Sequence, residues 1–196
     1  MSGTIGDNVY RASGVVASAG GGGAWNFISE TALDDSTILI TGLDSTYDTY
    51  AYVMDSGHFD TSSGGQWYQA QLYQDGAAVS TSSYNWAMTN MGDWRSEVTC
   101  SYSTATTYWK LAHDGMKNDA ANAQDMVLWL FHPSSTTLWP SILWAKMGET
   151  GDSRTQVNYG GGQFQGTGTA TTGLQFVPGE GSFDGGTMRL YGISKS

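Results

Sequence analysis

Short apolar or alternating runs, separated by clusters of Gly, Ser, Asp and Asn, fill the chain from Trp25 onward. Because strand side chains point to opposite faces in turn, this pattern is typical of short strands joined by turns. The runs predict about eleven strands, enough for two packed sheets. Their ranges are 25–29, 37–42, 49–54, 66–74, 84–88, 107–112, 126–132, 141–148, 155–160, 173–177 and 187–193. A short helix fits only in 113–125, where a loop fits equally well.

The alternation also predicts which side chains face the core. In the run 66–74, Tyr68, Ala70 and Leu72 share one face, and in 187–193 Met188, Leu190 and Gly192 do the same. By contrast, "MVLWLF" (126–131) is apolar on both faces. This run predicts a central strand, or a strand whose second face is covered by an arm or a partner. Asp75 and Gly76, directly after a strand, indicate a tight turn.

The first 23 residues differ from the rest and end in the run "AGGGGA" (19–24). Four glycines hold no single conformation and indicate a hinge. We therefore divide the chain into an N-terminal arm with a Gly-rich hinge (1–23) and a β-sandwich domain (24–196). The arm is either a first strand or frayed tail, or a segment that packs on a neighbouring subunit. In the second interpretation its candidate contact residues are Val9, Tyr10, Arg11, Val15 and Val16.

Charge and composition exclude several classes of function. The chain has 196 residues, only 8 Lys and Arg, and a formal net charge of -10. Nonspecific nucleic-acid affinity requires cations that neutralise phosphates, so nucleic acid is excluded as the main partner. Aromatic residues make up 13% of the chain, which argues against disorder. We find neither a signal-peptide pattern nor an apolar stretch long enough for a membrane span, and expect no membrane partner.

No pattern of catalytic or metal-binding residues emerges. His58, His113 and His132 are scattered without a Cys partner, and Cys100, the single cysteine, fits folding in a reducing cytoplasm. No G-x-S-x-G motif or EF-hand pattern is present, and most acidic residues lie in turns. The stretch "GGGQFQGTGTATTG" (160–173) lacks the lysine and following helix of a phosphate cradle and indicates a flexible hairpin or surface loop. We expect no enzyme activity, no cofactor and no metal.

The eight tryptophans raise the question of exposed aromatic contacts. Most of them should lie in the core, but exposed aromatic rings stack on sugars or fill protein interfaces. Trp67 and Trp94 are the best candidates for exposed contact residues.

Three segments of the chain have a distinctive sequence: "STILITGLDSTYDTYAYVMDSG" (36–57), "YQDGAAVSTSSYNWAM" (73–88) and "TTGLQFVPGEGSFDGGTMRLYGISKS" (171–196), with its "RLYGI" strand. In this order and spacing they resemble parts of tailed-bacteriophage virion structural proteins. The resemblance covers most of 36–196, with a gap at about 92–124. It implies an all-β fold, an antiparallel, jelly-roll-like β-sandwich, in a capsid decoration (cement) protein, a head fibre or a tail component. It brings no catalytic or cofactor residues.

From the resemblance and the arm we expect a capsid decoration protein that bridges and stabilises capsid subunits. It would be made in the bacterial host cytoplasm and located in the virion, as a trimer or dimer that gains avidity from several contacts. The alternative is a tail or fibre component that binds host surface glycans through Tyr, Trp, Asn and Asp. A hydrolytic depolymerase is a third, less favoured interpretation.

Overall fold

The computed structural model describes residues 25–60, 67–93, 98–112, 123–149, 154–166 and 168–194. Every regular element in these ranges is a strand, and all the paired strands are antiparallel. The larger sheet has eight strands in the order β1 (Trp25–Ala32), β13 (Phe183–Ile193), β3 (Thr49–Phe59), β9 (Gln124–Phe131), β10 (Ser141–Glu149), β11 (Thr155–Phe164), β6 (Tyr84–Gly92) and β7 (Thr99–Thr106).

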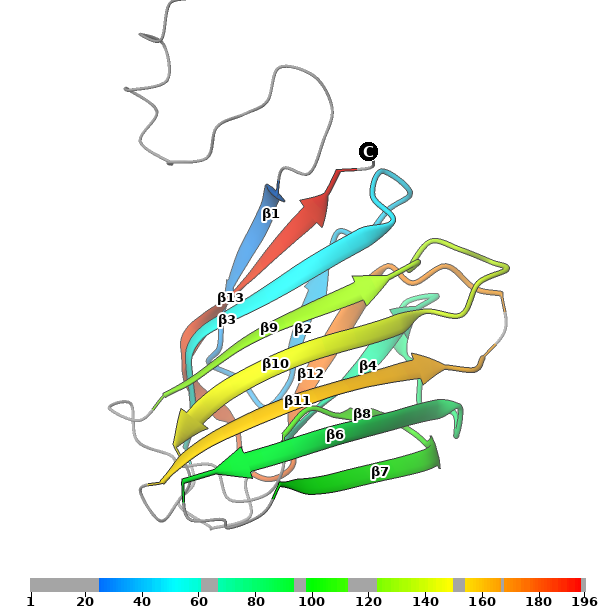
Figure 1. Ribbon diagram of the computed structural model, residues 1–196. Coiled ribbons are helices and arrows are strands. Elements are labelled where there is room, and N and C mark those ends of the chain that lie inside the picture. The colour runs from blue at the N-terminus through cyan, green and yellow to red at the C-terminus, as the bar shows by residue number, and fades with distance from the viewer. Residues whose placement is uncertain are drawn as a thin grey trace, which may run out of the picture.

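The smaller, five-stranded sheet packs against one face of the larger sheet. Its order is β2 (Ile38–Thr41), β12 (Gly173–Pro178), β4 (Tyr68–Gln74) and β5 (Ala77–Ala78), and β8 (Trp109–Lys110) also pairs with β4. Figure 1 shows the eight-stranded sheet in front, from β1 at the top to β7 at the bottom, with the smaller sheet behind. The chain crosses repeatedly between the sheets, and its first and last strands are neighbours. The predicted antiparallel β-sandwich is confirmed.

The core lies between the two sheets and follows the predicted alternation. Tyr68, Ala70 and Leu72 of β4 are fully buried, and Met188 and Leu190 of β13, in the larger sheet, belong to the same buried cluster. The hydroxyl of Tyr84 in β6 links the sheets, because it accepts a hydrogen bond from Leu72 N at 3.0 Å and donates to Val79 O at 2.9 Å.

The strand predicted to be central is central. β9 lies between β3 and β10, with Met126, Leu128 and Leu130 buried in the core. Its other face carries Val127 and Trp129, which point away from the smaller sheet. The Asp75–Gly76 turn is also confirmed: both residues have positive φ (50° and 80°), the backbone of a mirror-image hairpin turn.

The prediction of a flexible hairpin or surface loop at 160–173 is partly wrong. β11 continues through Gly160, Gly161 and Gly162 to Phe164, paired with β10 on one side and β6 on the other. The glycines are required by packing, because a Cβ at Gly160 would overlap the indole of Trp144 and one at Gly162 would lie 2.5 Å from Trp109 Cδ1. Glycine in a strand marks such a close approach.

Two further points of the prediction concern strand β7 and the segment 113–125, in which a short helix would fit. β7 was not predicted, because its sequence "TCSYSTAT" contains few apolar residues. Residues 113–122, most of the segment in which a helix would fit, lie outside the described residues, and Gln124 and Asp125 belong to β9.

One end of the core is polar. Lys146 on β10 pairs across the sheet with Asn158 on β11, which pairs with Asn90 on β6, and all three side chains are buried. Asn158 Nδ2 donates to Asn90 Oδ1 at 2.9 Å. Lys146 Nζ makes no hydrogen bond within the described structure, and burial lowers the pKa of Lys146 to about 7. A charged amine would be costly here, so the neutral form is favoured.

Candidate interaction surface

The outer face of the eight-stranded sheet, which points away from the smaller sheet, is the candidate functional surface. Strand pairing arranges its side chains in rows that cross all eight strands. One row consists of Glu30, Arg189, Val53, Val127, Ala145, Tyr159, Thr89 and Cys100. The next row consists of Phe27, Tyr191, Ala51, Trp129, Leu143, Gly161, Ala87 and Tyr102. From β9 to β7, these two rows contain no charged residue.

Several apolar side chains of this face are exposed to solvent. On β10, Leu143 and Met147 are 51% and 53% exposed, whereas the alternating residues Ile142 and Trp144 are buried. Tyr159 on β11 is 50% exposed. The strand "SILWAKMG" is therefore apolar on both faces, like β9. Single exposed apolar residues are common, but a contiguous apolar group over several strands is typical of an interaction site.

One corner of this face, over β1, β13, β3 and β9, carries several charged groups. Arg189 Nε contacts Glu30 Oε2 at 2.6 Å, and Arg189 Nη1 contacts Asp55 Oδ2 at 3.3 Å. These hydrogen bonds, first to Glu30 and then to Asp55, raise the pKa of the Arg189 guanidinium. Asp125 is held nearby, since its Oδ1 accepts a hydrogen bond from Ser56 N at 2.9 Å. The corner thus forms a charged rim beside the apolar rows.

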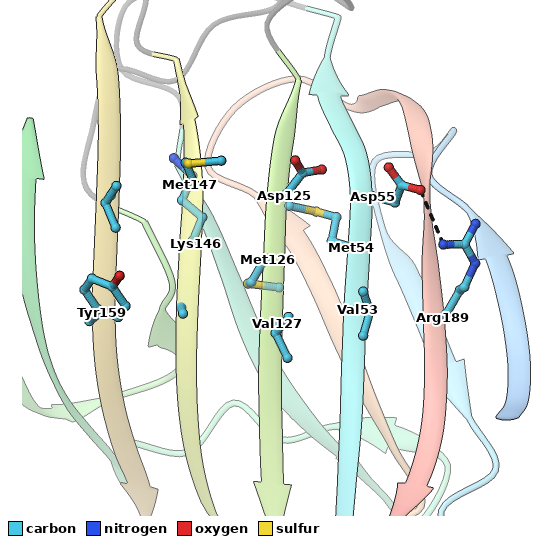
Figure 2. Close-up of a pocket in the computed structure, with 12 residues that line it drawn as sticks. Val53, Met54, Asp55, Asp125, Met126, Val127, Lys146, Met147, Tyr159 and Arg189 are labelled. Atoms are coloured by element: carbon cyan, nitrogen blue, oxygen red, sulfur yellow. Dashed lines mark hydrogen bonds and ion pairs between the residues drawn. The ribbon is translucent and has the colours of Figure 1, made fainter. Parts of the chain in front are cut away.

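Three depressions lie along this sheet. The first, of about 450 Å³, extends from Asp55 and Arg189 over Val53 and Val127 to Met147 and Tyr159. Figure 2 shows this arrangement, with the Asp55–Arg189 pair on one side and Met147 and Tyr159 on the other. Two others, of about 380 and 480 Å³, adjoin Tyr102. Both are lined in part by glycines of β11, and the one of about 480 Å³ lies beside Gly161, which faces outward and has no side chain to fill it.

The whole outer face of the eight-stranded sheet is close to the size of a protein interface. Eight strands about 4.8 Å apart, each contributing some six residues at about 3.3 Å, span roughly 700 Å². A stable interface of standard size covers roughly 800 Å² on each partner. An apolar centre with a polar rim is the usual arrangement of such interfaces.

Of the predicted contact residues, the structure describes only Trp67, which lies at the smaller sheet and not on this face. Val9, Tyr10, Arg11, Val15, Val16 and Trp94 lie outside the described residues. Trp67 is half-buried at the start of β4, where its ring lies 5.4 Å from the ring of Tyr108 and beneath Lys110 Nζ, 4.9 Å from the ring centroid. Trp67 therefore packs in a local cluster of the smaller sheet.

Sequence reasoning missed most of the exposed apolar residues. Tyr102 on β7 is 79% exposed, and Leu138 and Trp139 in the loop before β10 are also exposed. The two-faced apolar pattern of "SILWAKMG" was an available signal for Leu143 and Met147. No comparable signal marked Tyr102, because its strand was not recognised.

The described residues contain no group of three or more His, Cys, Asp or Glu arranged to hold a metal ion. No helix in these ranges has the length and apolar character to cross a membrane.

Comparisons with known proteins add no relative. No protein-family model matches the chain, and neither the curated proteins nor the solved structures gave a match.

Proposed function

We propose that this chain is a structural protein of a tailed-phage particle, which acts by packing the outer face of its eight-stranded sheet against another virion protein. The observation that carries the proposal is the exposed apolar surface across β9, β10 and β11, centred on Leu143, Met147 and Tyr159. Binding of a partner over an apolar area of this extent is favourable, because it removes that area from water. The phage assignment itself rests on the three sequence segments that resemble virion proteins.

Within the particle, a capsid decoration (cement) role fits the surface best. A decoration protein binds an already folded shell, so it needs a preformed rigid face rather than a site that closes on a small molecule. β9 and β10 provide that rigidity, because both are paired on both edges and anchored in the core by Leu128 and Trp144. The apolar centre would supply affinity, and the Arg189 corner would orient the partner.

Particle incorporation of matched variants tests the proposal. Met147→Lys and Tyr159→Lys place a charge on the outer face of the larger sheet. Leu39→Lys places the same charge at an exposed apolar position of β2, in the smaller sheet. Mass spectrometry of purified particles should detect the wild type and Leu39→Lys, with both outer-face variants strongly reduced. Absence of the wild type from particles, or equal incorporation of all variants, would contradict the proposal.

A host-glycan-binding role in a tail or fibre is the second candidate, and one feature favours it. The depression of about 380 Å³ is flanked by the rings of Tyr102 and Tyr159 and lined by Thr89. Exposed aromatic rings beside hydroxyl groups suit sugar stacking. Binding of the isolated wild-type protein to a glycan array, lost in Tyr102→Ala and Tyr159→Ala, would favour this role over the decoration role.

A further inference from the structure

β7 is an edge strand of the larger sheet, and no described strand pairs with its outer edge. Its pairing with β6 is regular from Thr99 to Ser103, without a bulge until the end of the strand. Residues 98–109 contain no charged residue, proline or glycine. An edge of this kind leaves a row of backbone N–H and C=O groups ready to pair with another strand.

The other edges have features that discourage such pairing. β1, at the opposite edge of the same sheet, has a bulge between Phe27 and Ser29 and carries Glu30 in an ion pair with Arg189. At the edges of the smaller sheet, β2 has four residues, and β5 and β8 have two each. Short, bulged or charged edges are the usual means by which proteins avoid edge-to-edge association. β7 has none of these features along its regular part.

A second observation is that apolar side chains are exposed at the same edge. Tyr102, in the middle of β7, is 79% exposed and lies on the outer face. Val98, next to the start of the strand, is 58% exposed. Pairing along β7 would cover the tyrosine ring as well as the backbone groups.

We propose that two copies of this chain pair through β7, antiparallel, about a twofold axis perpendicular to the sheet. The pairing joins the two eight-stranded sheets into one, with both outer faces on the same side. Directly opposite residues of an antiparallel pair point to the same face, so Tyr102 of each copy meets an outer-face residue of the other. The dimer thereby presents a single apolar face of twice the width.

A second copy is the occupant that the edge favours. A twofold antiparallel pair uses the same edge in both copies, so the contact closes after two subunits and does not grow into a filament. Each copy carries a net charge of -10, and an uncharged edge lets two such chains approach with little local repulsion. Pairing β7 with β1 of another copy would instead be open-ended and would meet the bulge and Glu30.

Light scattering during size-exclusion chromatography tests the pairing without reference to particles. The wild type should have twice the monomer mass of 21.0 kDa. Tyr102→Lys places a charge in the middle of the edge and should raise the dimer dissociation constant at least about tenfold, without loss of the β-sheet spectrum. Tyr159→Lys, on the outer face but away from the edge, is the matched control and should remain dimeric.

Cysteine scanning identifies the register. In a Cys100→Ser background, single cysteines are placed in turn at the positions from 100 to 104. The residue at the twofold axis lies opposite the same residue of the second copy. Their Cα atoms are about 4.5–5.5 Å apart, a distance that suits a disulfide. One position should therefore oxidise to a covalent dimer much faster than the others. A wild type that stays monomeric, a trimeric mass, or a dimer that Tyr102→Lys leaves intact would overturn the inference.

This test and the incorporation test are independent. A monomer that still enters particles would refute the β7 dimer and leave the proposed function standing. A protein that dimerises but is absent from particles would refute the proposed function and leave the β7 dimer standing.

Discussion

Gly160 lies beneath the indole ring of Trp144, its partner across the β10–β11 pair, and a Cβ at Gly160 would overlap that ring. Trp144 is almost fully buried, so the ring has no free space into which to move. Because Gly160 has no side chain, this part of the core can accommodate the Trp144 ring.

Gly160→Ala should destabilise the fold by about 1–3 kcal/mol, the usual cost of overpacking a core. Gly161→Ala is the matched control, because its Cβ would point to the outer face, 3.8 Å from Leu143 Cδ1 and 3.3 Å from Ile142 O. Its effect should stay within about 1 kcal/mol, helped by the lower chain entropy of alanine. Urea unfolding measures both. Equal losses for the two variants would show that the ring does not require Gly160.

Tyr84→Phe should lower the free energy of unfolding by about 1–3 kcal/mol, because it leaves Leu72 N and Val79 O without the hydroxyl that joins the two sheets. Tyr52→Phe is the contrasting variant: the buried Tyr52 hydroxyl has no hydrogen-bond partner in the described structure, so its removal should be neutral or stabilising. Thermal unfolding distinguishes the two. A larger loss for Tyr52→Phe would contradict this hydrogen-bond assignment.

Lys146→Met should stabilise the fold by a few kcal/mol, in a pH-dependent way. Burial lowers the pKa of Lys146 in the native state to about 7 from its ordinary 10.5. Below pH 7 both states carry the charge and the native state is destabilised in full. Between pH 7 and 10.5 the unfolded state binds more protons, so wild-type stability rises with pH. The advantage of Lys146→Met should therefore be largest at or below pH 7 and shrink toward pH 10.5.

Denaturant unfolding across this pH range measures the two curves. The hydrophobic contribution of the methionine side chain is independent of pH, so only the charge can produce a slope in the difference. A difference that stays constant from pH 6 to pH 10.5 would mean that Lys146 is not titrating as a buried amine.

Met147→Ser should change the free energy of unfolding by no more than about 1 kcal/mol, because this side chain is half exposed on the outer face. Met126→Ala, on the buried face of the adjacent strand β9, should cost about 2–5 kcal/mol. Both residues are apolar and belong to neighbouring strands, so their stability effects separate a core position from a surface available to a partner. A loss above about 2 kcal/mol for Met147→Ser would place Met147 in the core.

The alternation of side chains predicted the sandwich, the inward faces of β4 and β13, and the central position of β9. It could not predict β7, because Thr, Ser and Cys give no contrast between an inner and an outer face. The predicted strand 155–160 ended too early, because the roles of Gly160 and Gly162 depend on Trp144 and Trp109, which come from distant parts of the sequence. Local sequence shows that a residue is glycine, but not which ring lies above it.

The candidate surface was predictable only in part. The two-faced apolar pattern of β9 indicated that a partner or arm could cover its second face. The extent of the surface depends on which strands lie beside β9, because Leu143 and Tyr159 join Val127 and Trp129 only through the order β9, β10, β11. Strand order is set by long-range pairing and is not encoded in any single run of residues.

A density map of the intact phage particle is the most direct test of the proposed function. We expect density for this sandwich on the particle, with the outer face of β9, β10 and β11 against another virion protein and with Met147 and Tyr159 in the contact. A map in which the chain is absent, or in which that face points into solvent while another surface makes the contact, would contradict it.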